Sequence, residues 1–248
     1  MRLLIIRHGD PDYEHNDLTP AGKDEAELLV PRMKREEISE FYVSPLGRAK
    51  ATARPTLEAL GRTAAELEWL REFSIPILRP DKNGDYSFVP WDWLPSDWLQ
   101  DPRLLDWERW RENEIMAAED VGGKYDRVTA EFDKLLEAHG YRRNGLLYDA
   151  VQPNADTLAF FCHFGLGCVL LSHLMNCSPM VLWQGMCMPP SSVTTVYTEE
   201  RRPGIAVFRT LSMGDISHLY TAQVQPTFAA RFCEVTAMAL DRTEKEKT

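Results

Sequence analysis

Residues 3–10 read Leu3-Leu4-Ile5-Ile6-Arg7-His8-Gly9-Asp10, and in this stretch an apolar run ends in a cation, an imidazole and a glycine. The apolar part is too short for a helix but has the length of a strand buried on both faces, as in a parallel sheet. Ligands of such sheets bind at the carboxyl ends of the strands, so we expect Arg7 and His8 at the mouth of a crevice. Gly9 allows a sharp turn or a close approach of the backbone to a ligand. A strand that stops at a polar loop is the alternative that this stretch alone leaves open.

A second apolar run is likewise followed by a histidine and glycines: Thr157-Leu158-Ala159-Phe160-Phe161-Cys162. It ends in His163 and is followed by Gly165 and Gly167. The pattern predicts another buried strand, a turn that contains glycine, and a helix from about residue 166 to residue 175. His163 is therefore expected at a strand end, as His8 is.

Two pairs of a hydroxyl residue and a proline predict helix starts. Thr19-Pro20 combines an N-cap residue with proline at the first helical position, and it predicts a helix over about 20–35. Ser44-Pro45 repeats this signature and predicts a second helix with Arg48 in its first turn. Pro55 implies a kink or a break in that helix. Arg48 would then lie beside a helix N-terminus, where the positive potential suits an anion.

The remaining elements complete an α/β pattern. Leu67 to Leu70 is weakly strand-like and is terminated by Arg71-Glu72, as the first strand is by Arg7-His8. Strands that alternate with helices predict an α/β fold, a three-layer α/β/α sandwich with a mostly parallel central sheet and helices on both faces. The other predicted elements are a strand at 41–43, an amphipathic helix at 125–139, strands at 192–197 and 205–211, and a closing segment at 213–219.

The pattern changes between Phe73 and Gly123. Prolines and tryptophans alternate with acidic residues there, and the apolar residues do not keep the regular spacing of a long helix or strand. We interpret 73–123 as a cap inserted into a single domain that spans 1–248. Most of its tryptophans are expected to form a small core of the cap itself. The alternative is that one or two of them line a pocket and favour a leaving group with an aromatic or apolar body. The rings are Trp91, Trp93, Trp98, Trp107 and Trp110.

Composition and charge disfavour two classes of partner. Of the 248 residues, 44% are hydrophobic and 27% are charged, as in ordinary globular proteins. The formal net charge of -10 and the pI near 5.1 oppose non-specific attraction to nucleic acid or to anionic membranes. We therefore expect a small-molecule substrate, no nucleic-acid partner and no membrane partner.

The five cysteines are odd in number, and none forms a C-x-x-C pair. This usage indicates buried thiols in a reducing compartment. The first residues lack the hydrophobic core of a signal peptide, and no uninterrupted apolar segment could span a bilayer. The predicted location is cytoplasmic. The oligomeric state is left open, with a homodimer as one alternative.

Five polar residues are expected at strand or helix ends: Arg7, His8, Arg48, Glu72 and His163. Two guanidinium groups and two imidazoles around one point repel one another unless an anion joins them. A phosphoryl group suits them, because its oxygens match planar guanidinium groups in bidentate geometry. Each charge-assisted hydrogen bond contributes about 1.5–3 kcal/mol. In sum, such bonds are enough to hold a phosphate from dilute solution.

These residues, in this order and spacing, resemble the first branch of the histidine phosphatase superfamily, the phosphoglycerate mutase-like phosphatases. The resemblance covers nearly the whole chain outside 73–123. The second branch has an aspartate acid after the distal histidine, and Phe164 stands there in this chain, so the resemblance favours the first-branch acid, Glu72. The matching segments are Arg7-His8-Gly9 for the RHG motif, Leu18-Thr19 with Gly22, Ser44-Pro45-Leu46-Gly47-Arg48-Ala49 with Thr52-Ala53, Leu70-Arg71-Glu72, and Cys162-His163-Phe164-Gly165.

The resemblance implies a metal-independent phosphomonoesterase that needs no cofactor. His8 would attack phosphorus and become a transient phosphohistidine, and Glu72 would protonate the leaving oxygen. Arg7, Arg48 and His163 would hold the phosphoryl oxygens. The adjacent arginines should lower the pKa of His8 from its usual value of about 6.5 and so keep the nucleophile neutral. Glu72 would keep its proton through burial and through the negative charge of the bound phosphate.

Two other functions stay open. True mutases of this family carry a serine and an asparagine after the RHG motif, whereas the loop here reads Asp10-Pro11-Asp12-Tyr13-Glu14-His15-Asn16. This departure disfavours a phosphomutase. A non-catalytic module that binds a phospho-ligand or a phosphopeptide is the second alternative, and it is disfavoured by the complete set of His8, Arg48, Glu72 and His163. The sequence does not name the substrate.

The remaining histidines have structural interpretations. We interpret the polar loop around His15 as a turn rather than a metal site, because short loops rich in Asp and Asn usually form turns. His173 lies in an apolar helix and is expected to be a core imidazole with a hydrogen-bond partner. His218 is ambiguous, and could lie near the rim of the pocket or make a structural hydrogen bond.

Overall fold

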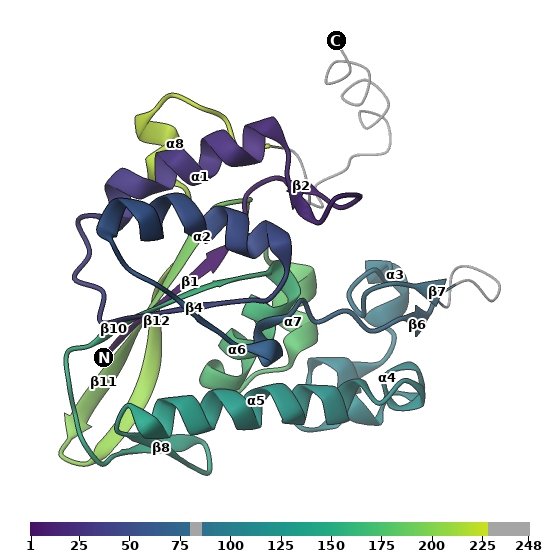
Figure 1. The fold of residues 1–248 in the computed structure, drawn as a ribbon. Coiled ribbons are helices and arrows are strands. Elements are labelled where there is room, and N and C mark those ends of the chain that lie inside the picture. The colour runs from purple at the N-terminus through teal and green to yellow at the C-terminus, as the bar shows by residue number, and fades with distance from the viewer. Residues whose placement is uncertain (80–85, 228–248) are drawn as a thin grey trace.

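The computed structural model of the chain describes residues 1–79 and 86–227, and within these ranges an eight-stranded sheet forms the centre of the molecule (Figure 1). The order of its strands is β5-β4-β10-β1-β11-β12-β9-β8. The strands from β5 to β1 are parallel to one another, and all other neighbours are antiparallel. The strands are β1 (Arg2–Arg7), β4 (Glu40–Val43), β5 (Ala65–Glu66), β8 (Tyr141–Asn144), β9 (Leu147–Ala150), β10 (Thr157–Cys162), β11 (Val193–Arg202) and β12 (Ile205–Asp215).

The predicted α/β/α sandwich is confirmed, and its sheet is mixed. β11 and β12 are joined by a tight turn in which Gly204 has φ +84°, and β8 and β9 by one in which Gly145 has φ +60°. Such short connections make neighbouring strands antiparallel. In contrast, β1, β4 and β10 are linked through helices and run parallel. The carboxyl ends that are predicted to carry the site belong to this parallel half.

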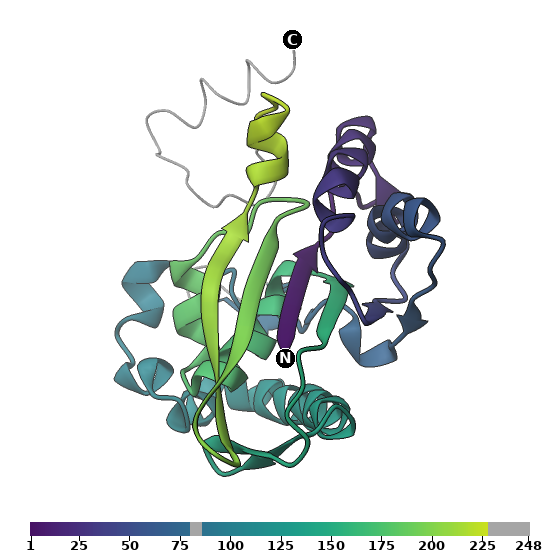
Figure 2. The same ribbon diagram turned by 90° about the vertical axis from the view of Figure 1, so that its left-hand side faces the viewer.

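Helices cover both faces of the sheet (Figures 1 and 2). Side chains of two helices join one buried cluster with β1, and side chains of three others join the cluster on the opposite face. The first pair is α1 (Pro20–Met33) and α2 (Gly47–Leu60), and the second set is α5 (Val121–Ala138), α6 (Phe164–Met175) and α7 (Pro179–Gly185).

β1 is buried on both faces, as predicted. Leu3 and Ile5 belong to the cluster with α5 and α6, and Leu4 and Ile6 belong to the cluster with α1 and α2. None of the four side chains is more than 2% exposed. Full burial of such a side chain contributes about 1.5–3 kcal/mol. The strand that ends in Arg7 is therefore firmly fixed between the two cores.

The two predicted helix starts turn out differently. Thr19 caps α1 as expected, and its hydroxyl accepts the Gly22 N–H at 3.1 Å. α2 begins later than expected, at Gly47, and its cap residue Leu46 makes no side-chain cap bond. The predicted cap Ser44 is displaced because its hydroxyl lies against His163 of the neighbouring strand end. Pro55 lies inside α2 and does not end it.

The predicted strand at 67–70 is wrong. Pairing with β4 ends early, because β5 covers only Ala65–Glu66 and the Leu67 N–H makes a last bond to the Val43 carbonyl. The chain then turns into a short 3₁₀ helix, η1 (Glu68–Leu70), which buries Leu70 in the core. Leucine fits either element, so its apolar character alone did not decide between them.

The described part of 73–123, here called the Trp-rich segment, packs on the main body as well as on itself. Its buried rings Trp91, Trp98 and Trp110 belong to the same core cluster as Leu3 of the sheet. The expected separate core does not form, because Trp91 and Trp110 pack against Trp183 of α7. The described elements of the segment are β6 (Ile77–Leu78), β7 (Tyr86–Ser87), α3 (Pro95–Trp98), η2 (Pro102–Leu105), η3 (Arg109–Glu112) and α4 (Glu114–Ala118).

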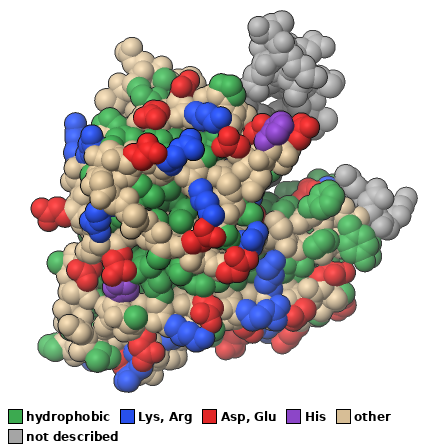
Figure 3. All heavy atoms as spheres, in the orientation of Figure 1, with side chains coloured by type: hydrophobic (Ala, Val, Ile, Leu, Met, Phe, Trp, Pro, Cys, Tyr) green, Lys and Arg blue, Asp and Glu red, His purple; other side chains and the backbone are tan. Residues whose placement is uncertain are grey.

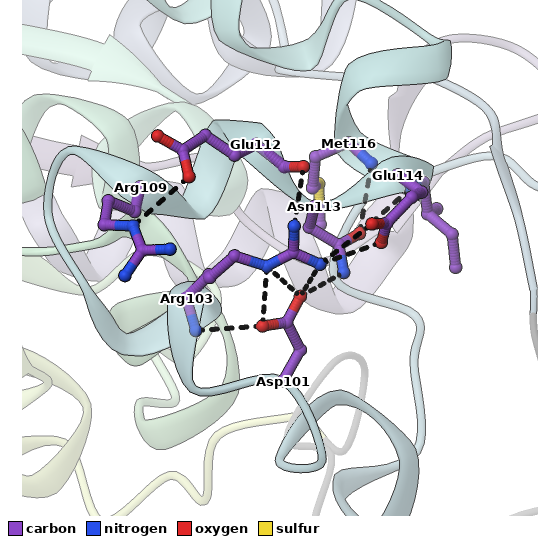
Figure 4. A network of polar contacts seen from close by, with 8 residues as sticks. Asp101, Arg103, Arg109, Glu112, Asn113, Glu114 and Met116 are labelled. Carbon is purple, nitrogen blue, oxygen red and sulfur yellow. Dashed lines mark hydrogen bonds and ion pairs between the residues drawn. The ribbon is translucent and has the colours of Figure 1, made fainter.

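Acidic side chains of the Trp-rich segment are paired with arginines. Arg103 lies between Asp101 and Glu114, and donates to both, as Figure 4 shows. The hydrogen bonds that Asp101 accepts from Arg103 and Asn113 lower its pKa to about 2. Acidic and basic side chains also alternate along the lower edge of the face drawn in Figure 3. These pairs offset only part of the segment's negative charge, because 73–123 contains 11 acidic and 5 basic residues.

Three short elements lie at the periphery. β2 and β3 pair with each other next to the N-terminus of α1, and α8 packs against α1. In the described ranges, every helix is too short or too polar to cross a membrane. These elements are β2 (Pro11–Asp12), β3 (Asp17–Leu18) and α8 (Ser217–Thr221).

Candidate active site

The parallel register brings the two imidazoles together. Arg7 at the end of β1 lies opposite Cys162 at the end of β10, and the His8 N–H donates to the Cys162 carbonyl at 3.0 Å. The residues that follow are His8 and His163, whose ring centroids are 5.1 Å apart. Their side chains are 2% and 1% exposed. The predicted pair of strand-end imidazoles is therefore one buried cluster.

His8 is held as a neutral base. Its Nδ1 lies 2.7 Å from the Gly9 carbonyl oxygen, which can only accept, so Nδ1 carries the hydrogen. The other ring nitrogen, Nε2, then has a lone pair. Burial, followed by the charges of Arg7 and Arg48, lowers the pKa of His8 well below 6.5. At neutral pH His8 can therefore act as a nucleophile through Nε2.

Arg7 is buried beside this base. Its side chain is 3% exposed, and Nη1 donates to the carbonyl oxygen of Met188. The guanidinium carbon lies 5.8 Å from the centre of the Phe164 ring. Nε is buried and has no hydrogen-bond partner among residues 1–79 and 86–227. This N–H can therefore donate to a bound ligand.

Arg48 approaches from the first turn of α2. Nη1 donates to Oδ1 of Asn16 at 3.3 Å, and the guanidinium carbon lies 5.4 Å from the ring centre of Tyr13. The loop can come this close because residue 47 is glycine: a Cβ there would lie 2.0 Å from the Asn16 carbonyl oxygen. Nε of Arg48 is buried and, like that of Arg7, lacks a partner in the part of the chain that the structure describes.

His163 is the third polar group with an unused nitrogen. It precedes α6, and its Nε2 lies 2.8 Å from Oγ of Ser44. Nδ1 is buried without a partner in the described residues. Burial, then His8, Arg48 and Arg7, lower the pKa of this imidazole well below 6.5.

Glu72 lies at the N-terminus of α6. Oε1 accepts the N–H groups of Phe73 at 2.8 Å and Leu166 at 3.0 Å, and Oε2 accepts that of Gly165 at 3.4 Å. Burial raises the pKa of this carboxyl above 4.5, although the amides of Phe73 and Leu166 and the charges of Arg48 and Arg7 act against it. A carboxyl with a raised pKa can serve as a proton donor.

Close backbone contacts fix the loop that follows His8. A Cβ at Gly9 would lie 2.6 Å from the Gly22 carbonyl oxygen, so the loop and the first turn of α1 pack without side chains between them. Oγ1 of Thr52 accepts the Gly9 N–H at 2.9 Å, and Thr19 donates to Asp10 at 2.7 Å. Thr19 and Gly22 at the start of α1 and Thr52 of α2 thus fix the loop that follows His8.

Several residues of the site were not predicted as such. Ser44 was expected only as a cap, and Tyr13 and Asn16 only as loop residues. Met188 contributes a backbone carbonyl, and the Ser191 N–H donates to the His8 carbonyl at 3.1 Å with Ser191 at φ +59°. Met188 and Ser191 contact the site through their backbone, so the identity of their side chains gave no sign of these contacts.

The remaining histidines have protein partners. His218 lies 3.0 Å from Oγ of Ser191, which accounts for the ambiguous residue by a structural hydrogen bond. His173 contacts Asp133 at 2.9 Å, as expected for a core imidazole with a partner. His15 pairs with Asp12 at 2.8 Å in the exposed loop. In the ranges 1–79 and 86–227, no three His, Cys, Asp or Glu residues are grouped so that they could hold a metal ion.

The arrangement combines a neutral nucleophilic nitrogen, two guanidinium groups, a second imidazole and a carboxyl of raised pKa. Three of these groups, Arg7, Arg48 and His163, present buried nitrogens without protein partners in the described ranges. Such a cluster can bind a phosphoryl group by its oxygens and allow its transfer to the imidazole nitrogen.

Comparison with known sequences gives a consistent assignment. A sequence model described as the histidine phosphatase superfamily (branch 1) matches residues 3–210. Phosphoserine phosphatase 1 of Hydrogenobacter thermophilus is 22% identical over 152 residues, which are 56% of this chain and 66% of that protein. A putative phosphoserine phosphatase 2 of the same organism is 33% identical over 82 residues, which are 29% of this chain and 40% of that protein.

Solved structures with the same fold include several phosphatases. A phosphoserine phosphatase variant from Entamoeba histolytica, in complex with phosphoserine, has a TM-score of 0.55 and 16% identity, over 88% of this chain and 98% of that one. A mycobacterial glucosyl-3-phosphoglycerate phosphatase with VO3 has a TM-score of 0.54 and 19% identity, over 86% and 98%. The α-ribazole phosphatase of Shigella flexneri has a TM-score of 0.52 and 16% identity, over 87% and 96%. At these identities the likeness is one of fold.

Proposed function

The chain belongs to the histidine phosphatase superfamily (branch 1), and on that premise we propose that it hydrolyses a small phosphomonoester through a phosphohistidine on His8, without a metal ion. The observation that carries the proposal is the set of buried, unpartnered nitrogens on Arg7, Arg48 and His163 beside a neutral His8, within the described ranges. A buried unsatisfied polar group costs about 1–3 kcal/mol. A bound phosphoryl group would satisfy all three at once.

The first step is attack by Nε2 of His8 on phosphorus. The P–N bond forms as the bond from phosphorus to the leaving oxygen breaks. The Gly9 carbonyl, which already accepts the Nδ1–H group, stabilises the positive charge that develops on the ring. Arg7, Arg48 and His163 hold the phosphoryl oxygens. Positioning and charge neutralisation supply most of the catalysis in phosphoryl transfer, and here two arginines provide them.

Glu72 is the proposed acid. Oε1 already accepts two N–H groups, whereas Oε2 makes one long contact of 3.4 Å, so Oε2 is the oxygen that has room for the proton. It donates this proton to the leaving oxygen. The carboxylate that remains is stabilised by the N-terminus of α6. It then takes a proton from the water whose oxygen attacks phosphorus. As that O–P bond forms, the P–N bond to His8 breaks, which frees phosphate and returns both the acid and the neutral imidazole.

The substrate is proposed to be a monoester with one phosphate on a small alcohol. The phosphatases that share the fold act, by name, on phosphoserine, glucosyl-3-phosphoglycerate and α-ribazole phosphate. We propose that the Trp-rich segment covers the leaving-group side of the site as a cap. This proposal is supported by the contact of Trp91 with Phe164, whose ring also lies beside Arg7. The cytoplasmic location and the oligomeric state stay predictions.

A hydrolysis assay tests the proposed function. Wild-type protein, stripped of metal with EDTA, is tested on a panel of phosphomonoesters that includes phosphoserine, sugar phosphates and p-nitrophenyl phosphate, and released phosphate is measured. We expect turnover that survives EDTA and is abolished in His8→Ala. Binding of phosphate esters without turnover would instead support a non-catalytic module, and transfer to a second alcohol in place of water would support a phosphomutase.

A further inference from the structure

Backbone pairing places Ser44 beside His163. β4 and β10 are parallel neighbours with Val43 opposite Phe161, and the Ser44 N–H donates to the Phe161 carbonyl at 2.9 Å. Ser44 therefore follows the end of β4 as His163 follows the end of β10. The serine side chain is fully buried, and its Oγ lies 2.8 Å from Nε2 of the imidazole.

The hydroxyl of Ser44 determines the direction of this contact. Its Oγ already accepts the Leu46 N–H at 3.3 Å. A hydroxyl has one hydrogen to donate, and a buried hydrogen without an acceptor is unfavourable. Nε2 of His163 is the acceptor that the structure gives for it within residues 1–79 and 86–227. The serine is therefore the donor, and the imidazole accepts.

The acceptor role of Nε2 fixes the tautomer of His163. A neutral imidazole that accepts at one nitrogen carries its hydrogen on the other, here Nδ1. Nδ1 is the buried nitrogen that has no partner in the described part of the chain. Because the pKa of His163 lies well below 6.5, the ring is neutral before an anion binds, and it has this one N–H to offer. In the other tautomer Nδ1 would present a lone pair, which repels an oxyanion.

We propose that Ser44 is a positioning residue: its hydroxyl holds His163 in the Nδ1–H tautomer and so readies that group to donate to a phosphoryl oxygen. The inference rests on the proposed function for the identity of the anion. The same hydroxyl accepts the N–H of Leu46, the residue that precedes α2, so it also links His163 to the start of the helix that carries Arg48.

Nitrogen NMR of histidine-labelled protein tests the tautomer directly. The ¹⁵N shifts and the two-bond couplings to the ring hydrogens distinguish an imidazole protonated on Nδ1 from one protonated on Nε2. We expect the Nδ1–H form for His163 in the wild type, assigned by its absence from His163→Gln. We expect a mixture of forms, or the Nε2–H form, in Ser44→Ala. Ser172→Ala is the matched control, because it removes another fully buried hydroxyl, from α6.

Binding and turnover supply the second readout. The dissociation constant of inorganic phosphate should rise about tenfold in Ser44→Ala, the effect of about one hydrogen bond, and kcat/KM for p-nitrophenyl phosphate should fall by a similar factor. Ser44→Cys keeps a donor, although a weaker one on a larger atom, so both values should lie between those of wild type and Ser44→Ala. Ser172→Ala should match the wild type in both.

The outcomes separate this inference from the proposed function. An Nε2–H tautomer in the wild type overturns the role of Ser44, even if the enzyme is active, and this measurement needs no variant to fold. A Ser44→Ala protein that keeps the Nδ1–H form and the wild-type phosphate affinity overturns it as well. If the wild type has the expected tautomer and binds phosphate but hydrolyses no ester, the proposed function fails while the positioning role stands.

Discussion

His8 and Glu72 have pKa values displaced in opposite directions, and burial is the largest cause in both cases. Burial disfavours the imidazolium of His8, and the neighbouring guanidinium groups of Arg7 and Arg48 add to the effect. Burial also disfavours the carboxylate of Glu72, but there the same arginines act in the opposite sense. Burial thus favours an uncharged base and an uncharged acid around the same two arginines, the pair that the proposed phosphoryl transfer to His8 requires.

The role of Glu72 predicts a dependence on the leaving group. Glu72→Gln removes the proton donor, so alkyl phosphates, whose alkoxide leaves poorly, should lose about 10²–10⁴-fold in kcat. p-Nitrophenyl phosphate should lose far less, because p-nitrophenolate leaves without a proton. Steady-state kinetics on the two substrate types measure the difference. An equal loss on both would remove Glu72 from the acid role.

The same two groups predict a bell-shaped pH profile of kcat/KM. Activity needs neutral His8, whose pKa is lowered from 6.5, so activity falls only when the pH drops through that lowered pKa. It also needs protonated Glu72, whose pKa is raised from 4.5, so activity falls as the pH rises through the raised pKa. The optimum is therefore expected on the acidic side of neutrality.

A comparison with Glu72→Gln checks the assignment of the alkaline limb. Ionisation of the substrate phosphate affects both proteins alike, so a limb that belongs to Glu72 should vanish in the variant. If the fall in kcat/KM at alkaline pH keeps the same midpoint in Glu72→Gln, that fall belongs to another group. An optimum well above pH 8 in the wild type would contradict the need for a protonated Glu72, because that proton should be lost by then.

At the level of elements, the site depends on where α2 starts and how closely the loop after β1 approaches it. Gly47 lets the carbonyl of Asn16 lie against the first turn, and Asn16 in turn accepts from Arg48. The sequence predicted a helix capped by Ser44, but α2 begins three residues later, at Gly47. The hydroxyl–proline signature was real, but the serine contacts a neighbouring strand end, and no local pattern indicates such a tertiary contact.

Gly47→Ala is expected to disturb the approach of Arg48. The added Cβ would lie 2.0 Å from a backbone oxygen, which cannot rotate away, so the loop or the helix start must shift. We expect a loss of about 1–3 kcal/mol in the free energy of unfolding and a raised KM for phosphate esters. Gly185→Ala is the matched control, because a Cβ at Gly185 has no described neighbour within 4 Å. Equal behaviour of the two variants in denaturant melts and kinetics would contradict the packing argument.

On the scale of the whole molecule, the Trp-rich segment is joined to the site through α6. Trp91 packs so closely on Gly165 that a Cβ there would lie 2.0 Å from its ring. The N–H of Gly165 contacts Glu72, and its carbonyl accepts the indole N–H of Trp183. Trp91 of this segment therefore packs on the residue whose N–H contacts the proposed acid.

Gly165→Ala tests this connection. Displacement of Trp91 should destabilise the protein by about 1–3 kcal/mol and should lower kcat on alkyl phosphates more than on p-nitrophenyl phosphate, because the contact to Glu72 is disturbed. Gly167→Ala is the control in the same helix, since a Cβ there meets its nearest side chain at 3.5 Å. A stable Gly165→Ala protein with wild-type kinetics would show that the segment and the acid are independent.

The α/β layering and four of the five polar residues were predictable because their signals are local, whereas Glu72 was expected at the end of a strand that does not form. The sequence alone shows two apolar strands that end in Arg7-His8 and in His163. It also shows a helix that carries Arg48 and has a proline near its start. The antiparallel half of the sheet, the 3₁₀ turn before Glu72 and the partner of Ser44 were not predictable. Each depends on pairing or packing between segments far apart in the chain, and the residue types involved fit more than one arrangement.

Direct detection of the covalent intermediate tests the central claim, that a neutral His8 faces a bound phosphoryl group. The protein is mixed with an active substrate and quenched within milliseconds in alkali, because phosphohistidine hydrolyses in acid, and peptides are then mapped by mass spectrometry. We predict that one phosphoryl group is found on His8, that it forms before the first turnover is complete, and that it is absent in His8→Ala. Turnover of substrate with no phosphoryl group on His8 at any time, or with one on another residue, would contradict the account.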